Sequence, residues 1–295
     1  MAEAVTVTTP APAKRSRPTM LRALMRSRVA TIGLVVVVSL IVLAAAAPIV
    51  SSFPPNEIAP ERRLQSPNTT HWFGTDQIGR DIFSRVLHGG RTSMVVGLLV
   101  VVTTAVAGGI IGLLSGFYSR LDLVLMRLMD GMMAFPGILL AIALMASLGP
   151  SARNVVIALA IVYTPRVARV ARAVVLVIRE QPFIEAGRAL GGSDLRVLAR
   201  HVAPNTLGPI NVQLTFVFAY AILAEASLSF LGVGPPPDVP TWGNILASGR
   251  SYLTLAPWIT LFPGLAIMIT VLALNLLGDG LRDLLDPRLR GRGSE

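Results

Sequence analysis

Six long apolar runs dominate this sequence and limit the folds that it can adopt. Each run is long enough to cross the roughly 30 Å hydrocarbon core of a bilayer as an α-helix of about 20 residues. Only 14% of the residues are charged, and the mean hydropathy is +0.66, whereas soluble domains have about 25% charged residues. We therefore predict an all-α membrane protein with six transmembrane helices. The expected spans are residues 29–50, 93–117, 121–148, 154–178, 207–231 and 255–277.

Polar and basic segments divide the chain around these spans. Residues 1–28 form a basic tail, residues 51–92 a polar segment with several prolines, and residues 282–295 a short basic tail. Residues 93–281 form the expected core, with the remaining spans. The first span, residues 29–50, follows a long basic stretch, which favours an uncleaved anchor over a cleaved signal peptide.

The basic residues predict which side of the membrane each segment faces. Most of the 26 Lys and Arg residues lie in the two tails, around the start of the third span and between the fourth and fifth spans. Because basic loops stay in the cytoplasm, we expect cytoplasmic N and C termini and an extracytoplasmic segment 51–92. This placement accounts for the net charge of +10, so we expect contact with membrane lipid and no nucleic-acid partner.

Residues needed for several kinds of catalysis are missing from the sequence. It has no cysteine, and its three histidines lie in separate segments, so neither a disulfide nor a metal site is expected. The single lysine, Lys14, lies in the N-terminal tail, which excludes ATP binding through a Walker A loop. We therefore expect no catalytic residue, no enzyme activity and no cofactor bound by this chain.

Residues 182–205 are polar and basic and lie between the fourth and fifth expected spans. Helical spacing starts after Pro182, breaks at Gly191-Gly192 and resumes at Ser193-Asp194, where either residue is suited to an N-cap. Pro204 is suited to stop the second helix. The pattern predicts two short helices joined by a glycine turn on the cytoplasmic side. A hairpin between two spans in that position is typical of a site offered to a partner.

Several charged or helix-breaking residues lie within the spans. Asp130 and Arg127 are three positions apart and could pair across one helical turn. Pro136, in Phe135-Pro136-Gly137, predicts a kink that either lines a cavity or serves packing. Glu225 is costly inside a membrane, so it should face protein or water, either as a structural hydrogen-bond partner or as a pathway residue.

Two more patterns recur at helical spacing. Arg166, Arg169 and Arg172 share one face of the fourth span, beyond a break expected at Pro165. They lie either at the membrane exit or along a polar pathway inside the bundle. The second span has glycines on one face, which let two helices pack closely. These are Gly108, Gly112 and Gly116.

The hairpin resembles the EAA loop of ABC importer permeases. That family pattern is Glu-Ala-Ala, three residues, Gly, nine residues and then Ile-x-Leu-Pro. The matching residues here are Glu185-Ala186-Gly187, Gly191 and His201-Val202-Ala203-Pro204. Gly187, His201 and Ala203 depart from the pattern, and Gly187 is expected to loosen the first hairpin helix.

Other stretches are similar to the second permease subunit of dipeptide, oligopeptide and nickel importers. They comprise residues 73–85, 224–232, 240–243 and 278–288. Together with the hairpin, they extend the resemblance over roughly residues 20–290.

This resemblance implies a type I ABC importer permease fold in the bacterial inner membrane, together with several partners. The chain would pair with a paralogous permease subunit, and two cytoplasmic ATPase subunits would bind the hairpins, one each. An extracytoplasmic solute-binding protein would deliver substrate. ATP and magnesium would be bound by the ATPase subunits, whose closure would move the hairpin as a rigid lever.

Coupling to the ATPase is expected to depend on one set of hairpin residues. Leucines would supply apolar contacts, and Glu185 would act as a polar anchor. Glu185 and Arg188 could also brace the hairpin internally, and Gly191 permits a turn that a Cβ would obstruct. The full set is Glu185, Ala186, Arg188, Leu190, Gly191, Leu195, Leu198 and Pro204.

Peptides are the expected substrate, because a chain with few histidines and no cysteine is poorly suited to direct metal ligation. Glutathione and nickel chelates are alternatives within the same family. A different class, an ATP-independent secondary carrier, could use Glu225 to couple protons. Carriers usually contain an internal repeat, and this sequence has no convincing one.

Overall fold

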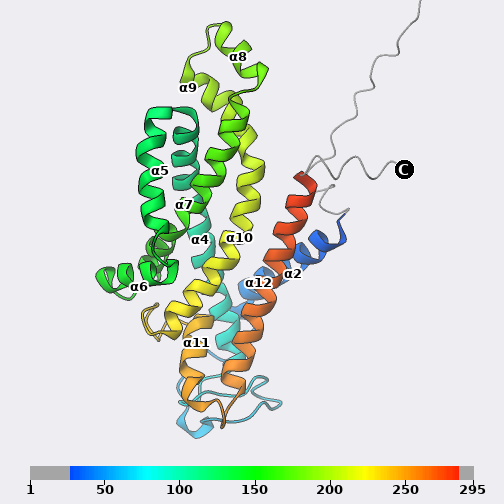
Figure 1. Cartoon of the computed structure of the whole chain (residues 1–295). Helices are drawn as coiled ribbons and strands as arrows, with labels where there is room; N and C mark the ends of the chain where they lie inside the picture. The colour runs from blue at the N-terminus through cyan, green and yellow to red at the C-terminus, as the bar shows by residue number, and fades with distance from the viewer. Residues whose placement is uncertain (1–26, 286–295) are drawn as a thin grey trace, which may run out of the picture.

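A computed structural model describes residues 27–285, and the regular structure in that range is helical apart from an isolated β-bridge between Thr75 and Asp81 (Figure 1). The longer helices form the bundle, and the short ones lie at its two ends or in connections. The elements are α2 (Arg28–Ala45), α3 (Ala47–Val50), η1 (Pro60–Arg62), α4 (Ile82–Phe117), α5 (Ser119–Met133), α6 (Gly137–Leu148), α7 (Ala152–Ile178), α8 (Pro182–Ala189), α9 (Asp194–Val197), η2 (Leu198–Val202), α10 (Ala203–Phe230), α11 (Trp242–Gly249), η3 (Arg250–Tyr252) and α12 (Trp258–Leu285).

The expected spans all correspond to helices. Within residues 27–285, α2, α4, the run Asp194–Phe230 and α12 are long and apolar enough to cross a membrane. The bent pair of α5 and α6 adds a fifth candidate. The remaining expected span corresponds to α7, which has 27 residues and packs against α4, α5, α6 and α10. The all-α membrane fold is therefore confirmed.

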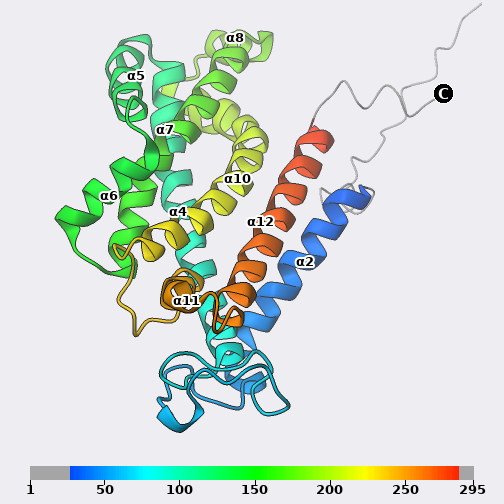
Figure 2. The same cartoon turned by 60° about the horizontal axis from the view of Figure 1, so that its bottom comes forward.

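The helices run alternately up and down the molecule. The start of α2 and the end of α12 lie in the same half as α8 and α9, and the loop of residues 51–81 lies at the opposite end (Figures 1 and 2). Gly280 of α12 touches Ala30 of α2, which holds these two helix ends together. The side of the membrane that each end faces stays a prediction.

The most extensive contact between two helices joins α4 and α7, and the glycines at four-residue spacing explain it. A Cβ at Gly108 would lie 2.8 Å from Cβ of Val167, and one at Gly116 would lie 2.6 Å from Cβ of Val175. A side chain at Gly112 would overlap Ala171. The predicted packing role of these glycines is therefore confirmed.

Pro165 lies inside α7, and the break expected there does not occur. Thr164, the preceding residue, donates its hydroxyl to the Ala160 carbonyl at 2.7 Å. Val167 and Ala171, in the turns beyond the proline, are fully buried. Packing on both sides of Pro165 therefore keeps the helix continuous, although the proline removes one backbone hydrogen bond.

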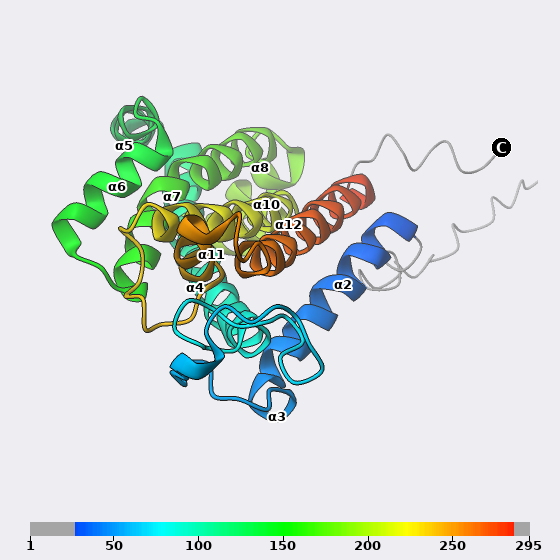
Figure 3. The ribbon, with the colours of Figure 1, turned by 90° about the horizontal axis from the view of Figure 1, so that it is seen from below.

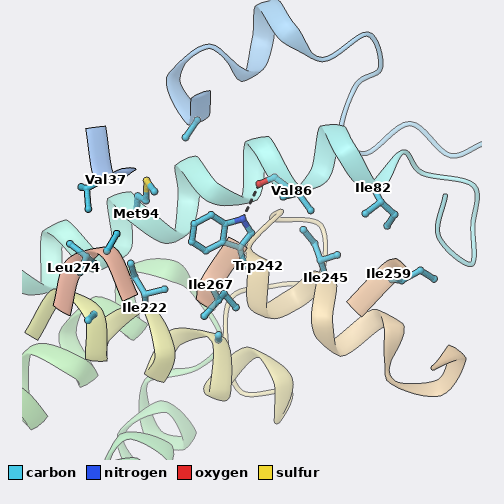
Figure 4. Close-up of a cluster of buried hydrophobic side chains, with 14 of the residues drawn as sticks. Val37, Ile82, Val86, Met94, Ile222, Trp242, Ile245, Ile259, Ile267 and Leu274 are labelled. Carbon is cyan, nitrogen blue, oxygen red and sulfur yellow. Dashed lines mark hydrogen bonds between the residues drawn. The ribbon is translucent and has the colours of Figure 1, made fainter. Parts of the chain in front are cut away.

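A second core joins α2, α4, α10, α11 and α12 around Trp242 (Figure 4). The indole Nε1 of Trp242 donates to the carbonyl of Val86 at 2.9 Å. Met94, Ile222 and Ile267 lie around the ring in the same buried cluster. This core fixes α11, which is too short to span, against the long helices.

Residues 51–81, here called the cap segment, lie at the end opposite α8 (Figures 1 and 2). A buried hydrogen bond in it joins His71 Nδ1 and Asp81 Oδ1 at 2.8 Å. Phe73 stacks on Phe262 of α12 with ring centroids 3.8 Å apart. Arg85 of α4 is buried and donates to the Pro55 carbonyl at 3.2 Å.

Candidate functional site

The hairpin of residues 182–205 projects at the end of the molecule where α4 and α7 finish (Figure 1). Its inner face is apolar and packs on those two helix ends. The buried residues of this small core are Phe117, Val175, Ile184, Val197, Leu198 and Val202. The hairpin is therefore attached to α4 and α7 by packing and to α10 by chain continuity.

The glycine turn ends α8 with a pair of backbone hydrogen bonds typical of a Schellman motif. Gly192 N–H donates to the Gly187 carbonyl at 3.1 Å, and Gly191 N–H donates to the Arg188 carbonyl at 2.9 Å. Gly191 has a φ of +81°, which favours glycine. Among the described residues, a Cβ at Gly191 would meet no atom within 4 Å, but one at Gly192 would lie 2.6 Å from the Gly187 carbonyl oxygen. Gly191 is needed for its backbone conformation, and Gly192 for space.

Arg188 braces the hairpin from within. Its Nε lies 3.6 Å from Oδ1 of Asp194, on the far side of the glycine turn. Its guanidinium also lies 5.3 Å from the ring centroid of Phe117, the last residue of α4. Both partners of the ion pair are about half exposed, so the pair adds little stability. Ser193 takes the expected N-cap position of α9, without a side-chain hydrogen bond.

Pro204 does not stop the second hairpin helix, contrary to the prediction. Residues 194–230 form one continuous helical run. Its π-helical turn, η2, ends with a hydrogen bond from Ala203 N–H to the Leu198 carbonyl. In this wider turn the backbone hydrogen bonds join residues five apart. The change in spacing comes just before Pro204, which has no N–H to donate to a regular α-helix. The hairpin therefore continues directly into α10.

The expected coupling residues divide into an exposed and a buried group. Leu190 is 89% exposed and Leu195 is 71% exposed, so both are available to a partner. Leu198 is 6% exposed and belongs to the hairpin core, where it supports the hairpin. Glu185 and Ala186 are exposed. No ion pair reaches Glu185 in the part of the chain that the structure describes.

The sequence interpretation missed Phe183, which is 46% exposed beside the other apolar residues of the hairpin. The sequence spacing could have identified Phe183, because Phe183 and Leu190 are seven residues apart and therefore lie near the same helix face. Gly187, the departure from the family pattern, has room for a side chain. The nearest atom to a Cβ there is Cδ2 of His201 at 3.9 Å.

Two arginines of α7 are held by acidic side chains of α5. Arg172 binds Asp122 through Nε and Nη2, at 2.5 and 2.7 Å, and Arg169 binds Asp130 at 2.6 Å. The expected pairing of Asp130 with Arg127 is wrong, because Asp130 points to α7, a separate helix. Arg166 lies over the rings of Tyr163 and Tyr220.

Glu225 lies in a buried network of hydroxyl groups. Ser93 of α4 donates to Oε2 at 3.0 Å, and Ser229 donates to Oε1 at 2.8 Å. Ser93 also accepts from the backbone N–H of Trp242 at 3.2 Å. The carboxyl is fully buried. The carboxyl therefore connects α4, α10 and α11, and the choice between a structural partner and a pathway residue stays a prediction.

Pro136 separates α5 from α6, as the predicted kink requires. The two helices are bent by 92° at this break. Pro136 occupies the N-cap position of α6, without a side-chain hydrogen bond. Its neighbour Phe135 is exposed at the bend. The bend therefore opens a surface on the flank of the bundle.

Comparison with known families places most of the chain in one group. Residues 108–291 match the family described as binding-protein-dependent transport system inner membrane component. Residues 19–67 match the family described as the N-terminal TM domain of oligopeptide transport permease C.

Individual relatives agree with these matches. The chain is 53% identical to a putative peptide transport system permease protein of Brucella suis over 92% of each chain. It is 45% identical to a dipeptide transport system permease protein of Alkalihalophilus pseudofirmus, covering 90% of this chain and 88% of the relative. A glutathione transport system permease protein of Escherichia coli is 47% identical, over 76% and 75% of the two chains.

The fold also matches a solved structure. A chain of the MetNI methionine ABC transporter superposes with a TM-score of 0.56 at 16% identity, covering 68% of this chain and 97% of that one. The arrangement of helices in this chain is therefore that of a type I ABC importer permease. Taken together, the matches show that this chain belongs to the family of binding-protein-dependent transport system inner membrane components, as a multi-pass membrane permease and not an enzyme.

Proposed function

We propose that this chain is one of two paralogous permease subunits in an ATP-driven peptide importer, and that hairpin 182–205 couples it to an ATPase subunit. The observation that carries the proposal is the exposed apolar surface of the hairpin. Phe183, Leu190 and Leu195 project from an element that lies beyond the ends of α4 and α7. Apolar side chains so exposed outside the membrane helices suit a protein partner.

The attachments of the hairpin support its role as a lever. Its inner face packs on α4 and α7, and its second helix continues into α10. A displacement of the hairpin by a closing ATPase dimer would therefore reach three long helices at once. The substrate path would lie between this chain and the second permease, with substrate delivered by an extracytoplasmic binding protein.

Peptides are the substrate class that the relatives favour. Their names refer to peptide and dipeptide transport, and glutathione, in the name of another relative, is itself a small peptide. A short peptide import assay therefore comes first, with glutathione as the second substrate. Nickel chelates are the remaining alternative, and a parallel nickel uptake assay separates them.

Co-purification and transport test the coupling. Tagged wild-type chain isolated from its native membrane should bring a second permease and two ATPase subunits, and should support ATP-dependent dipeptide uptake in proteoliposomes. Replacing Leu190 and Leu195 by Asp should remove the ATPase subunits and uptake together. Ser193→Asp is the matched control, since it adds a charge to the same hairpin at an N-cap position that accepts Asp.

Two results would contradict the proposal. Uptake that continues without ATP would indicate a secondary carrier. Retention of the ATPase subunits by the Leu190→Asp, Leu195→Asp variant would place the coupling surface elsewhere on the chain.

A further inference from the structure

The bend between α5 and α6 forms an open groove of about 820 Å³. It lies on the flank of the bundle away from α2 and α12, where the described chain provides no covering element (Figures 1 and 3). Its lining is apolar apart from one guanidinium. Residues on its walls include Leu123, Val124, Arg127, Leu128 and Phe135.

The groove lies at the depth of the membrane. Its helices qualify as a candidate span only as a bent pair. Gly137, at the bend, packs against Val162, and a Cβ there would lie 3.1 Å from Cγ1 of Val162. Val162 is close to the middle of α7 (Ala152–Ile178). The bend is therefore near the middle of the bundle and not at its surface loops.

Lipid is an unsuitable neighbour for the backbone at this bend. Within residues 27–285, no hydrogen-bond acceptor is found for the amide N–H groups of Phe135, Gly137 and Ile138. Non-helical backbone at membrane depth is tolerated only where protein or water covers it. The apolar walls of the groove favour protein over a water-filled cavity.

Arg127 indicates which charge the element that covers the groove should carry. It is exposed in the groove, and the two acidic residues of the same helix, Asp122 and Asp130, are bound to Arg172 and Arg169. No acidic side chain pairs with Arg127 in the described part of the chain. A guanidinium exposed on an otherwise apolar wall is complemented by a carboxylate, so the covering element should carry one.

We propose that the α5–α6 groove is the contact surface for a transmembrane helix of the second permease subunit, with an Asp or Glu of that helix paired to Arg127. Gly131 suits this contact, because no atom of residues 27–285 lies within 4 Å of a Cβ built there, which leaves room for a helix to approach. A transported peptide would cover the broken backbone only during passage, whereas a permanent subunit covers it throughout. This inference rests on the proposed function.

Single cysteines test the surface cleanly, because the chain has no cysteine of its own. Val124→Cys and Leu128→Cys lie in the groove, at 65% and 60% exposure, and Val106→Cys on α4 is a control at 59% exposure. A thiol-linked photocrosslinker in the complete native-membrane complex should join the two groove positions to the second permease, identified by mass spectrometry. The Val106 position should react with lipid.

Three outcomes would overturn the inference. The groove cysteines could react with a lipid-soluble probe as fully as the Val106 control does. They could instead crosslink to a second copy of this chain, or to a photoreactive dipeptide supplied for transport. A wild-type complex without a second permease would contradict the proposed function itself. A complex that contains the second permease but whose groove cysteines react with lipid would contradict only this inference.

Charge variants test the role of Arg127 separately. Arg127→Gln should lower recovery of the second permease on the tagged chain severalfold, and Arg127→Lys should restore part of it. Arg120→Gln removes an exposed arginine of the same helix outside the groove and should have no effect. Unchanged recovery with Arg127→Gln would rule out the carboxylate pairing.

Discussion

Gly191 and Gly192 are adjacent in the hairpin turn and are required for different reasons. Gly191 adopts a φ of +81° in open space, and Gly192 lies against the Gly187 carbonyl. The sequence could predict the turn, but not this division, because crowding depends on the path of the folded backbone. Substitutions at the two sites should therefore differ in which side chains they tolerate.

Replacing Gly191 by Val should disrupt the turn. A β-branched residue at positive φ costs on the order of 1–3 kcal/mol, which a short exposed hairpin has few contacts to offset. We expect loss of ATPase recovery and of ATP-dependent uptake, with membrane insertion retained. Gly191→Asn is the control, since Asn enters this region more easily. Equal loss in both variants would indicate that the side chain, and not the backbone, is responsible.

Replacing Glu225 by Leu should destabilise the bundle. The hydroxyls of Ser93 and Ser229 would lose their acceptor, at about 1–3 kcal/mol for each unsatisfied group. We expect a lower unfolding temperature in detergent. Ser227→Ala, which removes an exposed hydroxyl bonded only within its own helix, should have little effect. A Glu225→Leu variant as stable as wild type, with uptake lost, would move Glu225 to the pathway alternative.

At the scale of elements, ion pairs with α7 hold α5 in place. The spacing of Arg127 and Asp130 suggested a contact within one helix, yet Asp130 binds Arg169, 39 residues away. Local spacing shows which residues can meet along a helix, and only tertiary packing decides which do. The helix also continues through Pro204 for a reason that residue spacing does not show, because the π-helical turn η2 accommodates the proline.

The two pairs between α5 and α7 should differ in strength. Asp122 binds Arg172 with two hydrogen bonds, and these side chains are 23% and 34% exposed. Asp130 binds Arg169 with one, at 58% and 46% exposure. We expect Asp122→Asn to cost about 1–2 kcal/mol of unfolding free energy and Asp130→Asn less than about 1 kcal/mol. A double-mutant cycle with Arg172→Gln measures the coupling, and the opposite ranking would contradict this assignment.

At the scale of the whole molecule, apolar run length predicted nearly all of the fold. The six runs correspond to α2, α4, the α5–α6 pair, α7, α10 and α12. The glycine spacing predicted the contact between α4 and α7. The internal contacts of the cap segment could not be predicted, because the buried pair of His71 and Asp81 joins polar residues that show no helical or strand period. The exposed face of the hairpin was predicted in part, without Phe183.

The orientation of the molecule in the membrane can be measured with two cysteines. Ser193→Cys lies in the hairpin, and Ile58→Cys is exposed in the cap segment at the other end. The distribution of basic residues predicts that Ile58→Cys reacts with a membrane-impermeant maleimide in intact spheroplasts. Ser193→Cys should react only after the membrane is permeabilised. The reverse pattern would invert the predicted topology, including both termini.

The length of α4 has a mechanical consequence. Its 36 residues form one rod of about 54 Å, longer than the roughly 30 Å hydrocarbon core. One tip carries the cap segment through Asp81 and Arg85, and the other packs on the hairpin through Phe117. If the helix tilts as a rigid body about its centre, a tilt of about 10° moves its two ends by roughly 5 Å in opposite directions. Under the proposed function, docking of the binding protein at the cap-segment tip and ATP-driven movement at the hairpin tip would be two ends of one displacement, each favouring the other.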